Sequence, residues 1–177
     1  MKVLIVCEDP THDQYIVKPV VTRLFEDLPR RAQIEVLRDP HLRGIDDLLA
    51  ELPEIVRDNR MIDLFVVIAD RDCERQKNSD RLGRAASVDP RVVWCCAIEE
   101  VEAWMLALHR AELNWPAVRA DCDVKEHYAL PFLKSRGFGG LGQGRKRAMV
   151  GLGQSWRGLL QVCDEIVALG AKIKAGL

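Results

Sequence analysis

Three apolar runs are the clearest feature of the chain, and polar residues follow each of them. The runs span Val3–Cys7, Leu64–Ala69 and Val92–Ala97. An apolar run of this length without polar alternation is typical of a strand that is buried on both faces, as in a parallel sheet. A shorter alternating segment at 32–36 predicts a fourth strand nearer the edge of the sheet.

Helical patterns lie between and after the predicted strands. Thr11 and Gln14 form a capping-box pattern ahead of the first helix, and Pro19 inside that helix predicts a kink or two short helices. Apolar residues at helical spacing or loop-to-helix transitions place helices at 16–28, 45–56, within 73–86 and at 98–110.

Strand and helix therefore alternate four times, which predicts an α/β fold. We expect a Rossmann-like domain over residues 1–113, with a mostly parallel four-stranded sheet flanked by helices and right-handed crossovers. We expect residues 114–177 to form a helical, glycine-rich and basic extension that packs on the same domain. Its predicted parts are a helix at 121–136, a glycine-rich loop at 137–144 and a terminal helix at 155–174 capped by Ser155.

Composition narrows the class of protein. The chain has 177 residues, a net charge of -1 and 48% hydrophobic residues, which suits one globular domain. Uninterrupted apolar stretches such as Leu64–Ala69 are too short to cross a bilayer, and the start of the chain does not resemble a signal peptide. We therefore expect a cytoplasmic protein with no membrane partner. The six cysteines are expected to be reduced thiols, and their spacing gives no indication of a structural zinc site.

Acidic residues follow three of the predicted strands. They are Glu8 and Asp9, then Asp70 and Asp72, and then Glu99, Glu100 and Glu102. The carboxyl ends of parallel strands share one edge of a sheet, where ligands bind, so we expect these acids to lie together. Clustered carboxylates repel one another, and their hard oxygen atoms favour Mg²⁺ or Mn²⁺ as the counter-ion.

Spacing favours some of these acids over others. Asp70 and Asp72 point to the same side of an extended backbone, and Glu99 and Glu102 share one face of a helix, whereas Glu100 does not. Simpler interpretations remain open for each group. Glu8 or Asp9 is suited to cap the next helix, and Asp70 and Asp72 are typical of a polar turn after a strand. The three glutamates are typical of a solvent-exposed first helical turn.

The net charge hides a division along the chain. Residues 1–133 carry 18 cations and 25 anions, whereas residues 134–177 carry 8 cations and 2 anions, so the two parts have net charges of -7 and +6. Arg145, Lys146 and Arg147 follow directly after the glycine-rich segment, which suits contact with phosphates. We assign all three to nucleic-acid binding and Lys146 to catalysis. A flexible surface loop without function is the alternative for this segment.

The acidic motifs resemble those of the Toprim domain found in topoisomerases, primases and OLD-type nucleases. The resemblance rests on "VLIVCEDPT", "LFVVIADRD" and "IEEVEAW" and covers residues 1 to about 108. It implies that Glu8 is a general base or metal ligand, that Asp70 and Asp72 are metal ligands, and that Glu102 with Glu99 adds to the ligand set. Asp9 replaces the commoner glycine of the motif, which leaves open whether Glu8 or Asp9 is the ligand.

The same resemblance implies a function. It points to Mg²⁺- or Mn²⁺-dependent cleavage of nucleic-acid phosphodiesters, with DNA favoured over RNA. The motif sequences most resemble those of a small bacterial Toprim-like family whose genes lie beside ATPase genes in phage-defence neighbourhoods. This resemblance implies an ATPase partner. The sequence leaves the oligomeric state open, a homodimer included.

Two other functions compete with a nuclease. A phosphoacceptor domain resembling response-regulator receivers would use Glu8, Asp9 and Asp70, but the fourth strand ends without Ser or Thr and no fifth strand carrying Lys is apparent. A non-catalytic interaction subunit would keep the fold and use the extension to dock on a partner. The retained acids favour the enzyme.

Overall fold

The computed structural model describes residues 1–29, 31–74 and 76–176. In this part of the chain four parallel strands form one sheet in the order β2-β1-β3-β4. The strands are β1 (Lys2–Cys7), β2 (Gln33–Val36), β3 (Leu64–Asp70) and β4 (Val92–Ala97). The predicted α/β class with a four-stranded parallel sheet flanked by helices is therefore confirmed.

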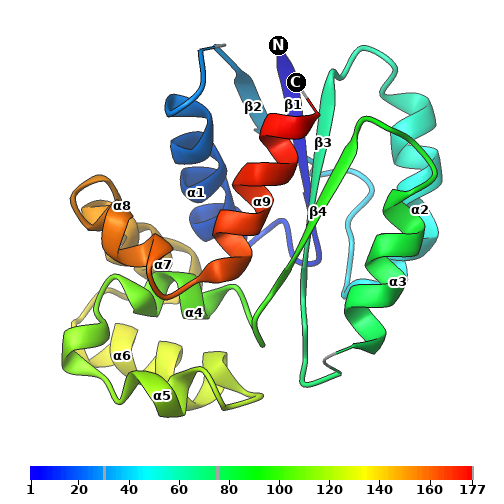
Figure 1. Cartoon of the computed structure of the whole chain (residues 1–177). Helices are drawn as coiled ribbons and strands as arrows, with labels where there is room; N and C mark the ends of the chain where they lie inside the picture. The colour runs from blue at the N-terminus through cyan, green and yellow to red at the C-terminus, as the bar shows by residue number, and fades with distance from the viewer. Residues whose placement is uncertain (30, 75, 177) are drawn as a thin grey trace.

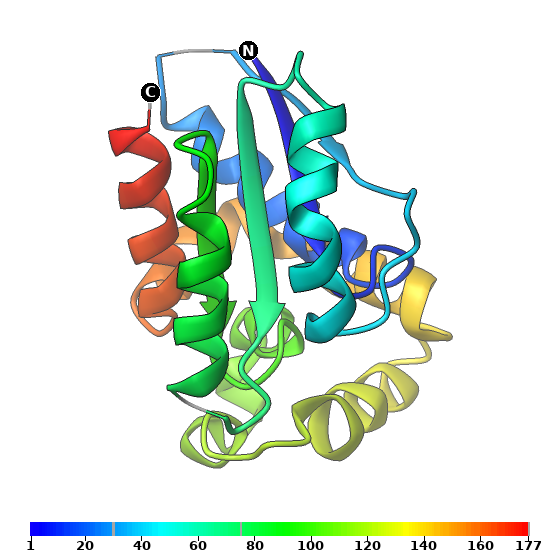
Figure 2. The same ribbon diagram turned by 90° about the vertical axis from the view of Figure 1, so that its right-hand side faces the viewer.

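Two layers of helices enclose the sheet (Figure 1). On one side lie α2 (Ile45–Asp58) and α3 (Lys77–Ala86), and on the other lie α1 (Gln14–Glu26) and α9 (Asp164–Ala175). The short helices α4 (Glu102–Ala107), α5 (Trp115–Val118) and α6 (Leu130–Ser135) lie beyond the carboxyl ends of the strands, as the arrowhead of β3 shows (Figure 2). The remaining helices are α7 (Leu141–Ala148) and α8 (Leu152–Leu160).

The apolar strands pack against both helical layers. In β1, Val3 and Ile5 join the core under α1 and α9, while Leu4 and Val6 join the core under α2 and α3. The side chains of β3 alternate in the same way. Period-two alternation between two cores explains why these strands have no polar face.

The C-terminal extension contributes to the core of the sheet domain. Helix α9 packs on β4, and its Glu165 accepts hydrogen bonds from Arg119 at 2.8 Å and from the indole of Trp104 at 3.0 Å. Lys172 donates to the carbonyl of Trp94 in β4 at 2.9 Å. No helix in the described part of the chain has the length and apolar character needed to cross a bilayer.

Several predicted helix boundaries are wrong. The predicted helix at 98–110 is reduced to α4, and the predicted helix at 121–136 begins only at Lys125, as a π-helical turn that leads into α6. The predicted terminal helix is two helices, α8 and α9, separated at Cys163. Asp164 and Glu165 occupy the first turn of α9, where negative charge favours a helix start.

Two local predictions near α1 are also corrected. Pro19 lies inside one continuous helix, so of the two predicted alternatives, a kink or two short helices, the second is wrong. Thr11 does not cap this helix, which begins at Gln14 after a turn in which the amides of Thr11 and His12 donate to the carboxylate of Asp9.

The glycine-rich segment is mostly helical. Only 137–140 precede α7, so Gly142 and Gly144 belong to this helix. A Cβ on Gly142 would lie 3.2 Å from the ring of Tyr15, and one on Gly144 would lie 3.0 Å from the carbonyl of Gly139. These glycines therefore allow α7 to pack closely on its neighbours, in place of the predicted loop.

The prediction of six reduced thiols is wrong for two cysteines. Cys73, after β3, and Cys122, after α5, form a disulfide, while the other four cysteines, all in the described part of the chain, are free thiols. Scattered spacing could not reveal this pair, since the two residues are 49 positions apart and meet only in the fold.

Loss of the disulfide should destabilise the protein. A cross-link that closes a loop of this length stabilises by about 4 kcal/mol through the entropy of the unfolded chain. Urea unfolding of the oxidised protein should therefore show a higher midpoint than that of the Cys73→Ala/Cys122→Ala double variant. Reductant should lower the midpoint of the wild type and leave that of the double variant unchanged. Equal midpoints for the oxidised wild type and the double variant would contradict the expectation.

Candidate metal centre

A cavity of about 590 Å³ lies at the carboxyl edge of the sheet. The chain leaves β1 toward β2 on one side, while β3 lies on the other, so the ends of β1 and β3 flank the point where the strand order reverses. Six acids contribute to its lining in addition to Asp9: Glu8, Asp13, Asp70, Asp72, Glu100 and Glu102. The expected convergence of acids from three strand ends is thus present in the structure.

Backbone hydrogen bonds fix the carboxylates of this cavity. Glu8 Oε1 accepts the amide of Asp70 at 2.7 Å, and Asp70 Oδ1 accepts the amide of Val101 at 2.9 Å. Glu100 Oε2 accepts the amide of Lys125. Each of these three acids therefore has one oxygen held by the backbone, and the other oxygen accepts no hydrogen bond from any described residue.

Three acids are close enough to share a metal ion. Asp70, Asp72 and Glu100 each offer one oxygen, and these oxygens lie within 4.8 Å of one another. Carboxylate oxygens are the ligands that Mg²⁺ and Mn²⁺ prefer, and the free oxygens of Asp70 and Glu100 are available for one. The residues present thus fit a hard divalent cation.

Glu99 holds the loop that carries Asp72. The carbonyl of Glu99 accepts the amides of Arg71 at 2.8 Å and Asp72 at 3.2 Å, and its carboxylate accepts the amide of Cys73 at 2.8 Å and pairs with the Arg71 guanidinium. Asp72 and Cys73 have left-handed φ values of 49° and 57°, which few residues other than glycine adopt unaided. The Glu99 contacts and the disulfide stabilise this conformation.

The expected pairing of Glu99 with Glu102 on one helical face is wrong. Helix α4 begins only at Glu102, and Glu99 has a left-handed φ of 58°, so helical spacing does not apply to the pair. Glu99 is fully buried and is not among the residues that line the cavity. Glu100, which spacing disfavoured, belongs to the group of three instead.

Burial and mutual repulsion keep these acids protonated to unusually high pH. Burial, with repulsion from Asp72 and Asp13, raises the pKa of Glu8 to about 8. Burial also raises the pKa of Glu100 to about 7 and that of Asp70 well above its usual range, with nearby carboxylates adding to both. A cluster of this kind releases protons when a cation binds.

The basic residues 145–147 point in different directions. Arg145, assigned from the sequence to nucleic acid, is 2% exposed and pairs with Glu102 and Asp13. Lys146 is exposed and lines a separate groove beside α1, and Arg147 donates to the carbonyl of Phe138. Successive helical residues are about 100° apart, so a run of three cations cannot face one ligand.

Lys125 and Arg43 are the cations beside the acids that sequence reasoning missed. Both line the cavity, and burial raises the pKa values of Asp72 and Glu100, a rise that the positive charge of Lys125 partly offsets. Arg43 lies in the loop after β2, and this loop reaches the same edge because β2 runs parallel to β1. The rule that loops after parallel strands meet at one edge of the sheet could have identified Arg43 from the sequence. Lys125 lies in the extension, and no sequence pattern indicated that it would reach the cavity.

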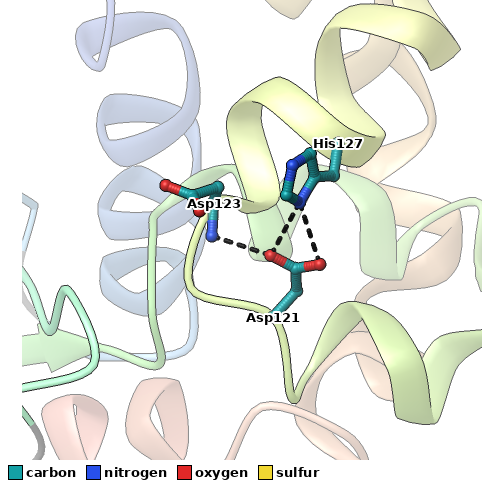
Figure 3. A group of neighbouring side chains, drawn as sticks. All are labelled: Asp121, Asp123 and His127. Carbon is teal, nitrogen blue, oxygen red and sulfur yellow. Dashed lines mark hydrogen bonds and ion pairs between the residues drawn. The ribbon is translucent and has the colours of Figure 1, made fainter.

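A second group of metal-type ligands lies in the extension (Figure 3). Asp121 and Asp123 precede the π-helical turn Lys125–Ala129, which contains His127, and none of the three lines the acidic cavity. Asp121 accepts the amide of Asp123 at 2.8 Å and contacts the His127 ring at 3.0 Å, which raises the pKa of His127. These hydrogen bonds account for the arrangement of the turn.

Comparison of the chain with protein-family models, curated proteins and solved structures finds no match. The side chains of the cavity are therefore the basis for assigning a function.

The raised pKa values predict that stability without metal falls as the pH rises. An unfolded glutamate has an ordinary pKa of 4.5, whereas burial raises the pKa of folded Glu8 to about 8, so the folded state binds more protons between these pH values. Between pH 5 and pH 8 in EDTA, the free energy of unfolding should drop by at least about 1.4 kcal/mol more than in Glu8→Gln, which cannot ionise.

Thermal and urea unfolding at several pH values would measure this drop. Glu51→Gln on α2, outside the cavity lining, is the matched control and should keep the wild-type slope. Mg²⁺ should restore most stability at pH 8. Identical slopes for wild type and Glu8→Gln would show that Glu8 does not carry the effect.

Proposed function

We propose that this protein is a Mg²⁺- or Mn²⁺-dependent phosphodiesterase of Toprim type that cleaves or nicks nucleic acid. The observation that carries the proposal is the convergence of Asp70, Asp72 and Glu100 within ligand distance beside Glu8 in one cavity. A divalent cation bound there would lower the pKa of a water molecule and neutralise charge on phosphoryl oxygens.

The residues of the chain have distinct roles in this proposal. Asp70, Asp72 and Glu100 hold the cation, with Asp70 and Glu100 each oriented by one backbone amide. Glu8, which is oriented by the amide of Asp70, acts as the general base, since a pKa near 8 matches proton transfer around neutral pH.

Positive charge beside the acids is supplied by Lys125 and Arg43. Both line the cavity, whereas Lys146, the sequence-based candidate, lines a different groove. Cations placed where negative charge develops on a phosphoryl group lower the barrier to its displacement. Lys125 thus replaces Lys146 as the catalytic cation in this proposal.

The substrate and setting follow from charge and from the sequence resemblance. Lys146 and Arg147 are exposed on α7 and are suited to contact the phosphate backbone of a nucleic-acid strand beyond the cavity. DNA is favoured over RNA as the substrate. A cytoplasmic location, an ATPase partner and a role in phage defence are the remaining parts of the proposal, and they rest on the sequence alone.

Asp72→Asn tests the enzymatic proposal. It removes one ligand charge at nearly constant shape, so nicking of supercoiled plasmid in Mg²⁺ or Mn²⁺ should fall by at least about 10- to 100-fold. Asp123→Asn, in the other acidic group, is the matched control and should retain activity. A folded wild type that binds Mn²⁺ but leaves plasmid DNA and single-stranded RNA intact would instead favour a non-catalytic docking role.

Lys125→Met separates the two candidate cations. Removing Lys125 should slow nicking by about 100-fold, as does loss of a single donor at a developing negative charge, without weakening Mn²⁺ binding. Lys146→Met should leave the cleavage step unchanged and only weaken binding of DNA at moderate salt. Nicking rates at saturating DNA, with Mn²⁺ affinity measured by calorimetry, provide the test; equal loss in the two variants would refute this assignment.

A further inference from the structure

Arg145 is a buried cation at one end of the acidic cavity. Its guanidinium pairs with Glu102 Oε1 and lies 3.3 Å from Asp13 Oδ1. Arg145 and Glu102 are each 2% exposed and Asp13 is 7% exposed, and all three line the same cavity as the metal-ligating group. An arginine in this place is a permanent charge, since its guanidinium does not deprotonate in proteins.

The packing of α7 fixes Arg145 in this position. Gly142 lets the helix approach Tyr15 of α1, and buried Gly144 lets it approach Leu133 of α6. The Nε atom of Arg145 is buried without a hydrogen-bond partner among the described residues. The guanidinium is thus held between the two carboxylates by the helix that carries it, even though one of its donors remains unsatisfied.

Five of the seven acids that line the cavity form two groups. Asp70, Asp72 and Glu100 can share an ion, whereas no group of three potential ligands among the described residues includes Asp13 or Glu102. The two groups line one cavity, so their negative charges repel one another. Arg145 pairs with Asp13 and Glu102, whereas no cation among the described residues forms an ion pair with Asp70, Asp72 or Glu100, although Lys125 and Arg43 line the same cavity.

We propose that Arg145 takes the place of a second metal ion, so that the cavity binds one divalent cation. This inference rests on the proposed function, in which Asp70, Asp72 and Glu100 hold that cation. The guanidinium occupies the carboxylate oxygens that a second ion would need and repels such an ion by its charge. Arg145 is therefore a positioning residue: it orients Glu102 and Asp13, and Asp13 in turn accepts the amide of Asp9 at 3.2 Å next to Glu8.

Counting bound Mn²⁺ tests the inference without relying on activity. Calorimetry and the paramagnetic resonance of free Mn²⁺ should give one ion per chain for the wild type and for Arg145→Lys, which keeps the charge. Arg145→Met should bind two, because it frees the Asp13 and Glu102 carboxylates. Arg145→Met combined with Asp13→Asn and Glu102→Gln should return to one.

The outcomes separate this inference from the proposed function. If the folded wild type binds no Mn²⁺, both the proposed function and the inference about Arg145 are wrong. Two ions in the wild type, or one in folded Arg145→Met, would overturn only the role of Arg145. If Arg145→Met is unfolded in EDTA, Mn²⁺ should restore its fold and again give two ions. If Arg145→Met does not fold in Mn²⁺ while the triple variant does fold, the inference is also overturned. If neither variant folds, the number of Mn²⁺ ions bound by the wild type decides.

Discussion

Electrostatic repulsion among the seven carboxylates that line one cavity is the constraint on which this structure depends. Three parallel strands end at one edge of the sheet, and most of the acids that follow them, although not Glu99, line a single cavity. The fold reduces the cost in three ways. Backbone amides donate to Glu8, Asp70 and Glu100, buried Arg145 neutralises the far end, and raised pKa values let some of the acids keep their protons. A bound cation would replace those protons, which is why the same cavity suits metal chemistry.

The loop that carries Asp72 shows how the rest of the structure serves this edge. Its left-handed residues are held by Glu99 from one side and by the Cys73–Cys122 disulfide from the other. The disulfide joins this loop to the segment that precedes Lys125, so a ligand and a cation of the cavity are tied to one covalent link. Side chains outside the cavity lining thus determine where Asp72 lies.

The strands were predictable from the sequence because their signal is local. An apolar run such as Leu64–Ala69 predicts a strand whose two faces are both covered by helices. The acids that come directly after such strands are then easy to locate in the sequence. Glu99 and Glu100 were interchanged because helical spacing was applied to residues that precede the helix, where one left-handed φ reverses the side-chain directions. No local pattern reveals such a backbone conformation in advance.

The glycines and the cations of α7 were misinterpreted for a related reason. A glycine-rich segment followed by Arg145, Lys146 and Arg147 has the composition of a phosphate-binding loop, yet here the glycines allow close helix packing. Their purpose depends on Tyr15 and on the preceding helix, which are distant in sequence or visible only in the fold.

The opposite charges of the two parts of the chain have a structural explanation. Residues 1–133 carry a net charge of -7 and residues 134–177 a net charge of +6, and Arg145 brings one cation of the second part into the acidic centre of the first. Helix α9 at the same time covers the face of β4 that belongs to the main core. The sheet without the extension would therefore have an open core and an uncompensated pair of buried acids. The extension removes both costs, because α9 covers β4 and Arg145 pairs with Asp13 and Glu102, so the acidic edge and the basic extension stabilise one another.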